Sequence, residues 1–145
     1  MSTGLKGEEL ALFTKGKEIY NRDGYCATCH QPDGKGLSAS QFPPLTGTHW
    51  VTGSEDRLIK VVLNGMMGPM TIGGKTYSGQ APMTPFGGLL NDDEIAAVLT
   101  YVRKSFGNEA TSILPAKVKQ VRTATAKQTG FYTPEQLLKQ HPMEK

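Results

Sequence analysis

The chain has 145 residues, of which 37% are hydrophobic and 20% are charged, and its formal net charge is +3. This length fits one globular domain with room for an appendage, and it leaves little for a second domain. No apolar run approaches the roughly 20 residues that span a bilayer, so we expect no transmembrane segment. The 17 glycines and 9 prolines indicate that much of the chain is loop.

The positive charge is concentrated near the C-terminus. Residues 1–102 hold eight Lys/Arg and ten Asp/Glu, a net charge of −2, whereas residues 103–145 hold eight and three, a net charge of +5. No Arg-rich motif and no alternation of basic with aromatic residues accompanies this charge, so we expect no nucleic-acid partner. A solvated basic face, or a docking site for an acidic partner protein, fits the pattern better.

The first periodic segment covers residues 8–20 and predicts a helix that ends near residues 23–24, just before a pair of cysteines. Its inward face is formed by residues at helical spacing, namely Leu12, Gly16, Ile19 and Tyr20. Residues 31–53 are rich in proline and glycine and show no sustained periodicity, which predicts a long ordered loop.

A second helix is expected over residues 55–63, with Ser54 as its cap, acidic residues in its first turn and Gly65 just beyond its end. Residues 70–77 then predict a small hairpin. The glycine pair at 73–74 supplies the positive φ angles that a two-residue turn needs.

The clearest helix signal lies at Asn91 and Glu94, which form a capping box ahead of an apolar run that extends to Phe106. Basic residues occupy its last turns, and Gly107 is expected to end it.

Two shorter helices are expected in the basic C-terminal part. Pro115 is a typical first-turn residue for a helix that places Val118 and Val121 inward and stops by Gly130. Residues 133–138 repeat the start signal for a short helix. With three to five helices and no long strand, the predicted fold class is mainly α.

The only two cysteines lie in the motif Cys26-Ala27-Thr28-Cys29-His30. This is the spacing of covalent c-type haem attachment. Two thioether bonds need thiols separated by the width between the vinyl groups of the porphyrin, and the next residue is then placed beneath the iron as its proximal ligand. We therefore expect one covalent haem c, held by Cys26 and Cys29, with His30 bound to iron.

A thioredoxin-like redox pair, a surface disulfide and a zinc half-site are the alternatives for the same cysteines. Zinc needs four ligands, usually from two such clusters, but the chain has no second cluster, and His49 and His141 lack ligand spacing. A redox pair is expected to open a helix directly after a strand. This pair instead follows a helix and precedes a predicted loop, so haem attachment is the favoured interpretation.

The sixth ligand of the iron distinguishes a carrier from a catalyst. A methionine fills that position and raises the reduction potential, whereas a haem ligated only by histidine leaves it open to a ligand. Of the six methionines, Met66, Met67 and Met70 lie near the predicted hairpin, and Met83 has prolines on both sides in a loop that the next helix anchors. A rigid loop suits an axial ligand, so Met83 is expected to bind iron. A haem protein with an open sixth site is the alternative.

Taken together, residues 8–108 resemble a class I cytochrome c domain. In that family a helix precedes the haem motif, a proline loop follows it, and an axial methionine precedes the last helix. The resemblance implies a cytochrome domain over residues 1–108 and a basic extension over residues 109–145 with one or two short helices. It also implies an electron carrier and not an enzyme.

The same resemblance assigns roles to residues around the motif. Gly16 and Tyr20 match a glycine and an aromatic residue that pack against the last helix, at the positions of Val98 and Tyr101. The segment from Pro43 to Gly47 resembles a loop in which a proline carbonyl accepts a hydrogen bond from the proximal histidine. Pro43 is the favoured acceptor and Pro44 the second choice.

Several segments are similar to cytochrome subunits or domains that serve periplasmic dehydrogenases of alcohols and sugars. They are residues 65–79 followed by Met83, 99–103, 106–108 and, less specifically, 121–125 and 132–137. This similarity implies a dehydrogenase as electron donor and an oxidase or another cytochrome as acceptor. The domain of a larger redox enzyme is the alternative.

Four side chains are candidates for binding the haem propionates, because buried carboxylates need donors. They are Trp50, Arg57, Tyr77 and Lys60.

Covalent haem attachment normally takes place outside the cytoplasm, so we expect a periplasmic or otherwise extracytoplasmic protein. The first residues lack the apolar stretch of a secretory signal. The expectation is therefore a mature form, an excised domain or a recombinant form.

Overall fold

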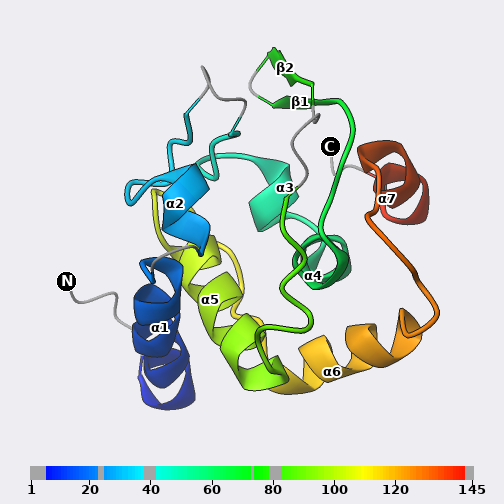
Figure 1. The fold of residues 1–145 in the computed structure, drawn as a ribbon. Coiled ribbons are helices and arrows are strands. Elements are labelled where there is room, and N and C mark those ends of the chain that lie inside the picture. Colours follow the sequence, from blue (N-terminus) through cyan, green and yellow to red (C-terminus); the bar gives the residue numbers. More distant parts are fainter. Residues whose placement is uncertain (1–5, 23–24, 38–41, 73, 79–82, 143–145) are drawn as a thin grey trace.

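The computed structural model describes residues 6–22, 25–37, 42–72, 74–78 and 83–142. Within these ranges the chain forms seven helices and one two-stranded hairpin, which confirms the mainly α class (Figure 1). The helices are α1 (Gly7–Tyr20), α2 (Cys26–His30), α3 (His49–Thr52), α4 (Glu55–Asn64), α5 (Asp92–Lys104), α6 (Pro115–Ala124) and α7 (Pro134–Gln140). The strands are β1 (Met70–Ile72) and β2 (Lys75–Tyr77). None of the helices in the described ranges is both long and apolar enough to cross a membrane.

Helices α1 and α5 lie side by side and form the most extensive helix pair (Figure 1). Gly16 permits their close approach, because a Cβ atom at this position would overlap the carbonyl oxygen of Ala97 and lie 2.8 Å from Cβ of Tyr101. The ring of Tyr20 also packs on Tyr101, with 5.4 Å between ring centroids. The expected packing of Gly16 and Tyr20 against Tyr101 is therefore confirmed, but the other residue that Gly16 meets most closely is Ala97 and not the expected Val98.

The capping box at the start of α5 forms as predicted. The Asn91 side chain accepts the Glu94 N–H at 2.8 Å, and the Glu94 carboxylate accepts the Asn91 N–H at 2.9 Å. The helix ends at Lys104, two residues before the predicted end at Phe106, because the backbone of Ser105 is extended, with φ −115° and ψ 176°. Phe106 then adopts a positive φ of 58°. This conformation accompanies the packing of its ring on Tyr20, at 5.3 Å between centroids.

The long loop predicted over residues 31–53 is interrupted by α3, so that prediction is wrong for four residues. Thr48 caps this single turn by accepting the Trp50 N–H at 3.2 Å, and burial of Trp50 and Val51 holds it in place. Helix α2 was likewise not expected. The second predicted helix forms as α4, whose cap Ser54 accepts the Arg57 N–H at 3.1 Å.

The predicted hairpin forms, and β1 pairs antiparallel with β2, from Met70 opposite Tyr77 to Ile72 opposite Lys75. In its turn Gly74 has a φ of +79°, whereas Gly73 lies outside the described residues. The predicted tail helices form as α6 and α7, although α6 ends six residues before Gly130.

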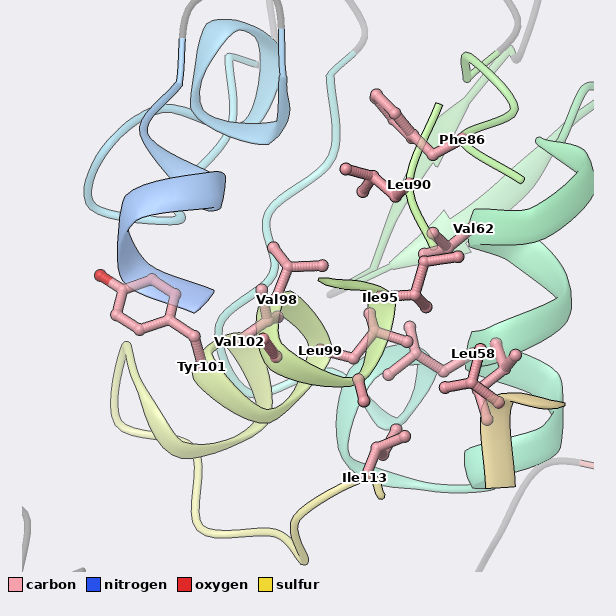
Figure 2. Packing of buried hydrophobic residues seen from close by; sticks show 14 of the residues in the cluster. Leu58, Val62, Phe86, Leu90, Ile95, Val98, Leu99, Tyr101, Val102 and Ile113 are labelled. Atoms are coloured by element: carbon pink, nitrogen blue, oxygen red, sulfur yellow. The ribbon is translucent and has the colours of Figure 1, made fainter. Parts of the chain in front are cut away.

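The C-terminal extension packs onto the rest of the chain. In Figure 1, α6 runs below α4 and α5, and α7 rises beside α4. Ile113, Val118 and Val121 are buried in the main core. Figure 2 shows part of that core, with the side chains of Leu58 on α4 and Leu99 on α5 near Ile113. A second apolar cluster consists of Trp50, Val61, Ile72, Tyr77, Tyr132 and Leu137.

Arginine side chains fasten the extension to the preceding part of the chain. Arg103 donates to the carbonyls of Val51 and Thr111, both at 2.8 Å. Arg122 donates to the Leu90 carbonyl at 3.1 Å and to the Asp92 carboxylate at 2.8 Å. The division into a cytochrome domain over residues 1–108 and an extension over residues 109–145 stays a prediction.

Candidate haem-binding site

Helix α2 presents the chemistry-bearing residues of the motif on one side. Cys29 and His30 follow Cys26 by three and four positions, which is the spacing of neighbours on a helical face. The helix ends at His30, and the next residue, Gln31, has a φ of 69° that turns the chain away. Tyr20 donates its hydroxyl to the Gln31 carbonyl at 2.7 Å, so α1 fixes the end of the motif.

The His30 ring is oriented by the proline loop. Its Nδ1 lies 2.8 Å from the Pro43 carbonyl oxygen, which can only accept, so Nδ1 carries the proton and Nε2 keeps a lone pair. Burial lowers the pKa of His30, and the bond to Pro43 opposes this in part. The ring is therefore held as a neutral imidazole, which is the form that binds metals. Pro43, rather than Pro44, makes this contact.

Asn108, a residue to which the sequence assigned no role, holds the proline loop in place. Its amide donates to the carbonyls of Leu45 and Val102, both at 3.0 Å, and its carbonyl accepts the Gly47 N–H at 2.9 Å. The side chain is only 5% exposed. An asparagine four residues past a helix end is an ordinary turn residue, so the sequence carries little signal for this role.

An apolar cavity lies beside the motif. Of the predicted site residues, those that line it are Cys26, Pro43, His30, Trp50 and Met83. The walls are formed by apolar side chains of α4, α5 and the adjoining loops, among them Leu45, Val62, Phe86, Leu90 and Leu99. Cys29, Arg57 and Tyr77 are not among its lining residues. An apolar cavity whose lining includes thiol, imidazole and thioether side chains fits a haem, which needs apolar contact and iron ligands.

Among the described residues, three methionines line this cavity, namely Met66, Met70 and Met83. Met67 is 43% exposed and does not. Met83 differs from the other two because it packs against both apolar clusters, including the main core that Cys26 also contacts, whereas Met66 and Met70 pack against the second cluster. The preceding Ala81 and Pro82 lie outside the described residues.

Arg57 is fully buried and does not itself line the cavity, although it packs on Trp50, which does. Its guanidinium donates to the carbonyls of His49 at 2.8 Å and His141 at 2.9 Å, and it lies 5.2 Å from the centre of the Trp50 ring. Lys60 bonds to Gln140 at 2.8 Å. Arg57 and Lys60 thus bind the end of the extension. Contact of Trp50, Arg57, Tyr77 or Lys60 with haem propionates stays a prediction.

The thiol chemistry differs from that of a redox pair. Burial raises the pKa of the Cys26 thiol to about 11, whereas the reactive cysteine of a thioredoxin-like pair has a lowered pKa. Within the described ranges, no group of three or more His, Cys, Asp or Glu side chains is arranged to hold a metal ion.

The cytochrome c family model matches residues 13–106, and the chain belongs to the cytochrome c family. The protein is therefore an electron carrier with one covalently bound haem c, and not itself an enzyme. A cytochrome c-552 of Thermus thermophilus is 35% identical over 130 residues, which cover 85% of this chain and 91% of that protein.

Two further relatives are parts of dehydrogenases. The cytochrome c subunit of a quinone alcohol dehydrogenase of Gluconobacter oxydans is 34% identical over 128 residues, 83% of this chain and 26% of that subunit. A fructose dehydrogenase cytochrome subunit of Gluconobacter japonicus is 34% identical over 120 residues, 78% of this chain and 23% of that subunit. The chain thus spans about a quarter of these subunits.

Proposed function

We propose that His30 and Met83 are the axial ligands of a haem attached at Cys26 and Cys29. We also propose that the protein passes electrons from a dehydrogenase to an oxidase or another cytochrome outside the cytoplasm. The observation that carries the ligand assignment is the shared cavity, which Cys26, His30 and Met83 all line.

The iron of a bound haem takes up and releases one electron at a time. The protein side chains create the conditions for this exchange. The Pro43 carbonyl keeps the His30 ring in one tautomer and strengthens its Nε2 as a donor. Apolar walls exclude water, and a low dielectric tunes the reduction potential.

The loop that carries Met83 is fixed at several points, as a permanent ligand requires. Its next turn is bonded to the end of α4, with the Phe86 N–H donating to the Val62 carbonyl at 2.8 Å and the Gly87 N–H to the Leu63 carbonyl at 3.1 Å. A ligand held in this way stays bound in both oxidation states, so little rearranges when the electron moves.

The proposed donor rests on the dehydrogenase subunits to which the chain is similar. Their names make a dehydrogenase of alcohols or sugars the candidate partner. The basic extension supports docking to an acidic surface, since charge complementarity speeds encounter. Such redox encounters are small in area and short-lived. A periplasmic location follows from the same partner and from the usual place of haem attachment.

Replacing each cavity methionine tests the ligand assignment. Methionine-ligated ferric haem has a weak far-red absorption band, which should be absent in Met83→Ala and retained in Met70→Ala and Met66→Ala. All three changes remove the same side chain from the same cavity, so packing losses are matched. Loss of the band in Met70→Ala or Met66→Ala with retention in Met83→Ala would overturn the assignment.

A further inference from the structure

The main chain around Met83 is joined to the C-terminal extension through the segment that follows α4. The Met83 N–H donates to the Met66 carbonyl at 2.9 Å, and the Met67 N–H donates to the Tyr132 carbonyl at 2.9 Å. Met66 thus forms an antiparallel bridge to Met83 and a parallel bridge to Tyr132. We call Met83, Met66 and Tyr132, joined in this order, the methionine ladder.

Gly65 adds a second connection between the same segments. Its φ is +75°, and an added Cβ atom would overlap the Met83 carbonyl oxygen and lie 2.8 Å from the ring of Phe131. Its carbonyl accepts the Tyr132 N–H at 3.2 Å. The extension therefore covers Gly65 on one side while the Met83 main chain lies against it.

The outer member of the ladder is itself firmly held. Tyr132 is 3% exposed and Leu137, on α7, is 0% exposed, and both belong to the second apolar cluster, against which Met83 packs. The end of α7 is tied to Arg57 through the His141 carbonyl. Because both ends of the ladder meet the same cluster, displacement of Tyr132 would loosen the packing and the hydrogen bonds around Met83.

We propose that residues 130–133 are a positioning element for Met83, acting through Met66. This inference rests on the proposed function, since it presupposes that Met83 binds iron. The family model matches residues 13–106, so the positioning element lies outside the matched part of the chain.

Imidazole binding to the ferric haem protein tests the proposal, because imidazole reaches the iron only when the methionine leaves it. We expect Tyr132→Ala to tighten apparent imidazole binding about tenfold, as followed by the shift of the main haem absorption band. The control is Val118→Ala, a core truncation in the same extension but in the other apolar cluster. It should lower thermal stability and change imidazole affinity by less than about twofold.

A second pair of variants, with milder substitutions, tests the same proposal if Tyr132→Ala does not fold. Phe131 is 38% exposed and covers Gly65, and Leu114 is a 45% exposed apolar residue elsewhere in the extension. Phe131→Ala should tighten imidazole binding about threefold, and Leu114→Ala should leave it unchanged. Wild-type affinity in Phe131→Ala, together with wild-type affinity in any folded Tyr132→Ala protein, would overturn the proposal.

Met83→Ala separates failure of this proposal from failure of the proposed function. If Met83 binds iron, its removal should tighten imidazole binding by about a hundredfold or more. An unchanged affinity in Met83→Ala would refute the ligand assignment itself. A large change in Met83→Ala with none in the extension variants would refute only the positioning role.

Discussion

Asn108 shows how much of the site depends on single buried side chains. It bonds three main-chain groups, on the proline loop and at the end of α5, and the proline loop in turn orients His30. The carbonyl group that orients His30 therefore depends on a residue far away in the sequence.

Replacing Asn108 should destabilise this connection. We expect Asn108→Ala to lower the free energy of unfolding by about 2–3 kcal/mol, because buried main-chain groups lose their partners. The control Asn64→Ala removes an amide with one long bond, to the Gln128 carbonyl at 3.5 Å, and should cost less than about 1 kcal/mol. Urea unfolding of the haem protein measures both. Equal losses in the two variants would contradict the role given to Asn108.

The buried phenol of Tyr20 makes the free energy of unfolding depend on pH in the alkaline range. Burial raises its pKa well above the ordinary value of 10.0, so the folded chain keeps the phenol neutral while the unfolded chain ionises. Its stabilising contribution is complete below pH ~10 and is lost as the pH rises further. Tyr20→Phe should lose about 1 kcal/mol at neutral pH, and its stability should fall less than that of the wild type between pH ~9 and ~11. Urea unfolding measures this difference. If the free energy of unfolding fell equally in Tyr20→Phe and in the wild type over this range, the prediction would be contradicted.

The residues of the haem motif were predictable from the sequence because haem attachment fixes their spacing. The hydrogen-bond partners of Arg57 were not predictable, because an arginine that binds a propionate and one that binds main-chain carbonyls look the same in sequence. Only the fold shows that its guanidinium meets the His49 and His141 carbonyls.

Among the elements, the pairing of α1 with α5 closes the fold around the site. The contact depends on the absence of a side chain at Gly16, where α1 meets Ala97.

Adding one methyl group there tests the pairing. Gly16→Ala should lower the free energy of unfolding by about 1–3 kcal/mol, because the helices must move apart. Gly88→Ala is the control, since no atom lies within 4 Å of its added Cβ, and it should change stability by less than about 0.5 kcal/mol. Thermal unfolding of both haem proteins gives the comparison. A Gly16→Ala protein as stable as Gly88→Ala would show that the helices do not meet this closely.

Elements with strong local signals were predicted well. The capping box of α5, the Ser54 cap of α4 and the glycine turn of the hairpin act within a few residues, so the sequence contains their cause. Helices α2 and α3 are single turns without periodicity, and contacts in the complete fold stabilise them. Helix α3 buries Trp50 and Val51, and Tyr20 of α1 bonds the Gln31 carbonyl just after α2. That information is absent from a short window of sequence.

For the molecule as a whole, the extension combines packing and charge. Some of its positive charge is used in ion pairs with the rest of the chain, from Lys117 to Asp56 at 2.6 Å and from Arg122 to Asp92 at 2.8 Å. Lys119 and Lys127 are exposed. The net charge of the extension was evident from the sequence, but its division between internal pairs and the exposed surface was not.

Charge reversal tests whether the extension guides the donor. The double variant Lys119→Glu/Lys127→Glu should slow reduction by an alcohol or sugar dehydrogenase about tenfold at low salt, and the difference should shrink as salt rises. The control Lys15→Glu/Lys35→Glu makes the same change in net charge elsewhere on the molecule. Stopped-flow reduction distinguishes them. Equal slowing in both would indicate an effect of net charge and not of docking at the extension.

The reaction of the reduced protein with carbon monoxide tests whether both axial positions of the iron are filled by the protein. A haem whose iron is closed by His30 and Met83 should show no shift of its main absorption band on addition of the gas, whereas Met83→Ala should shift at once. Ready binding of carbon monoxide by the unaltered protein would reveal an open sixth position. The protein would then be a haem protein with an open sixth site, and not a carrier whose iron is bound by both His30 and Met83.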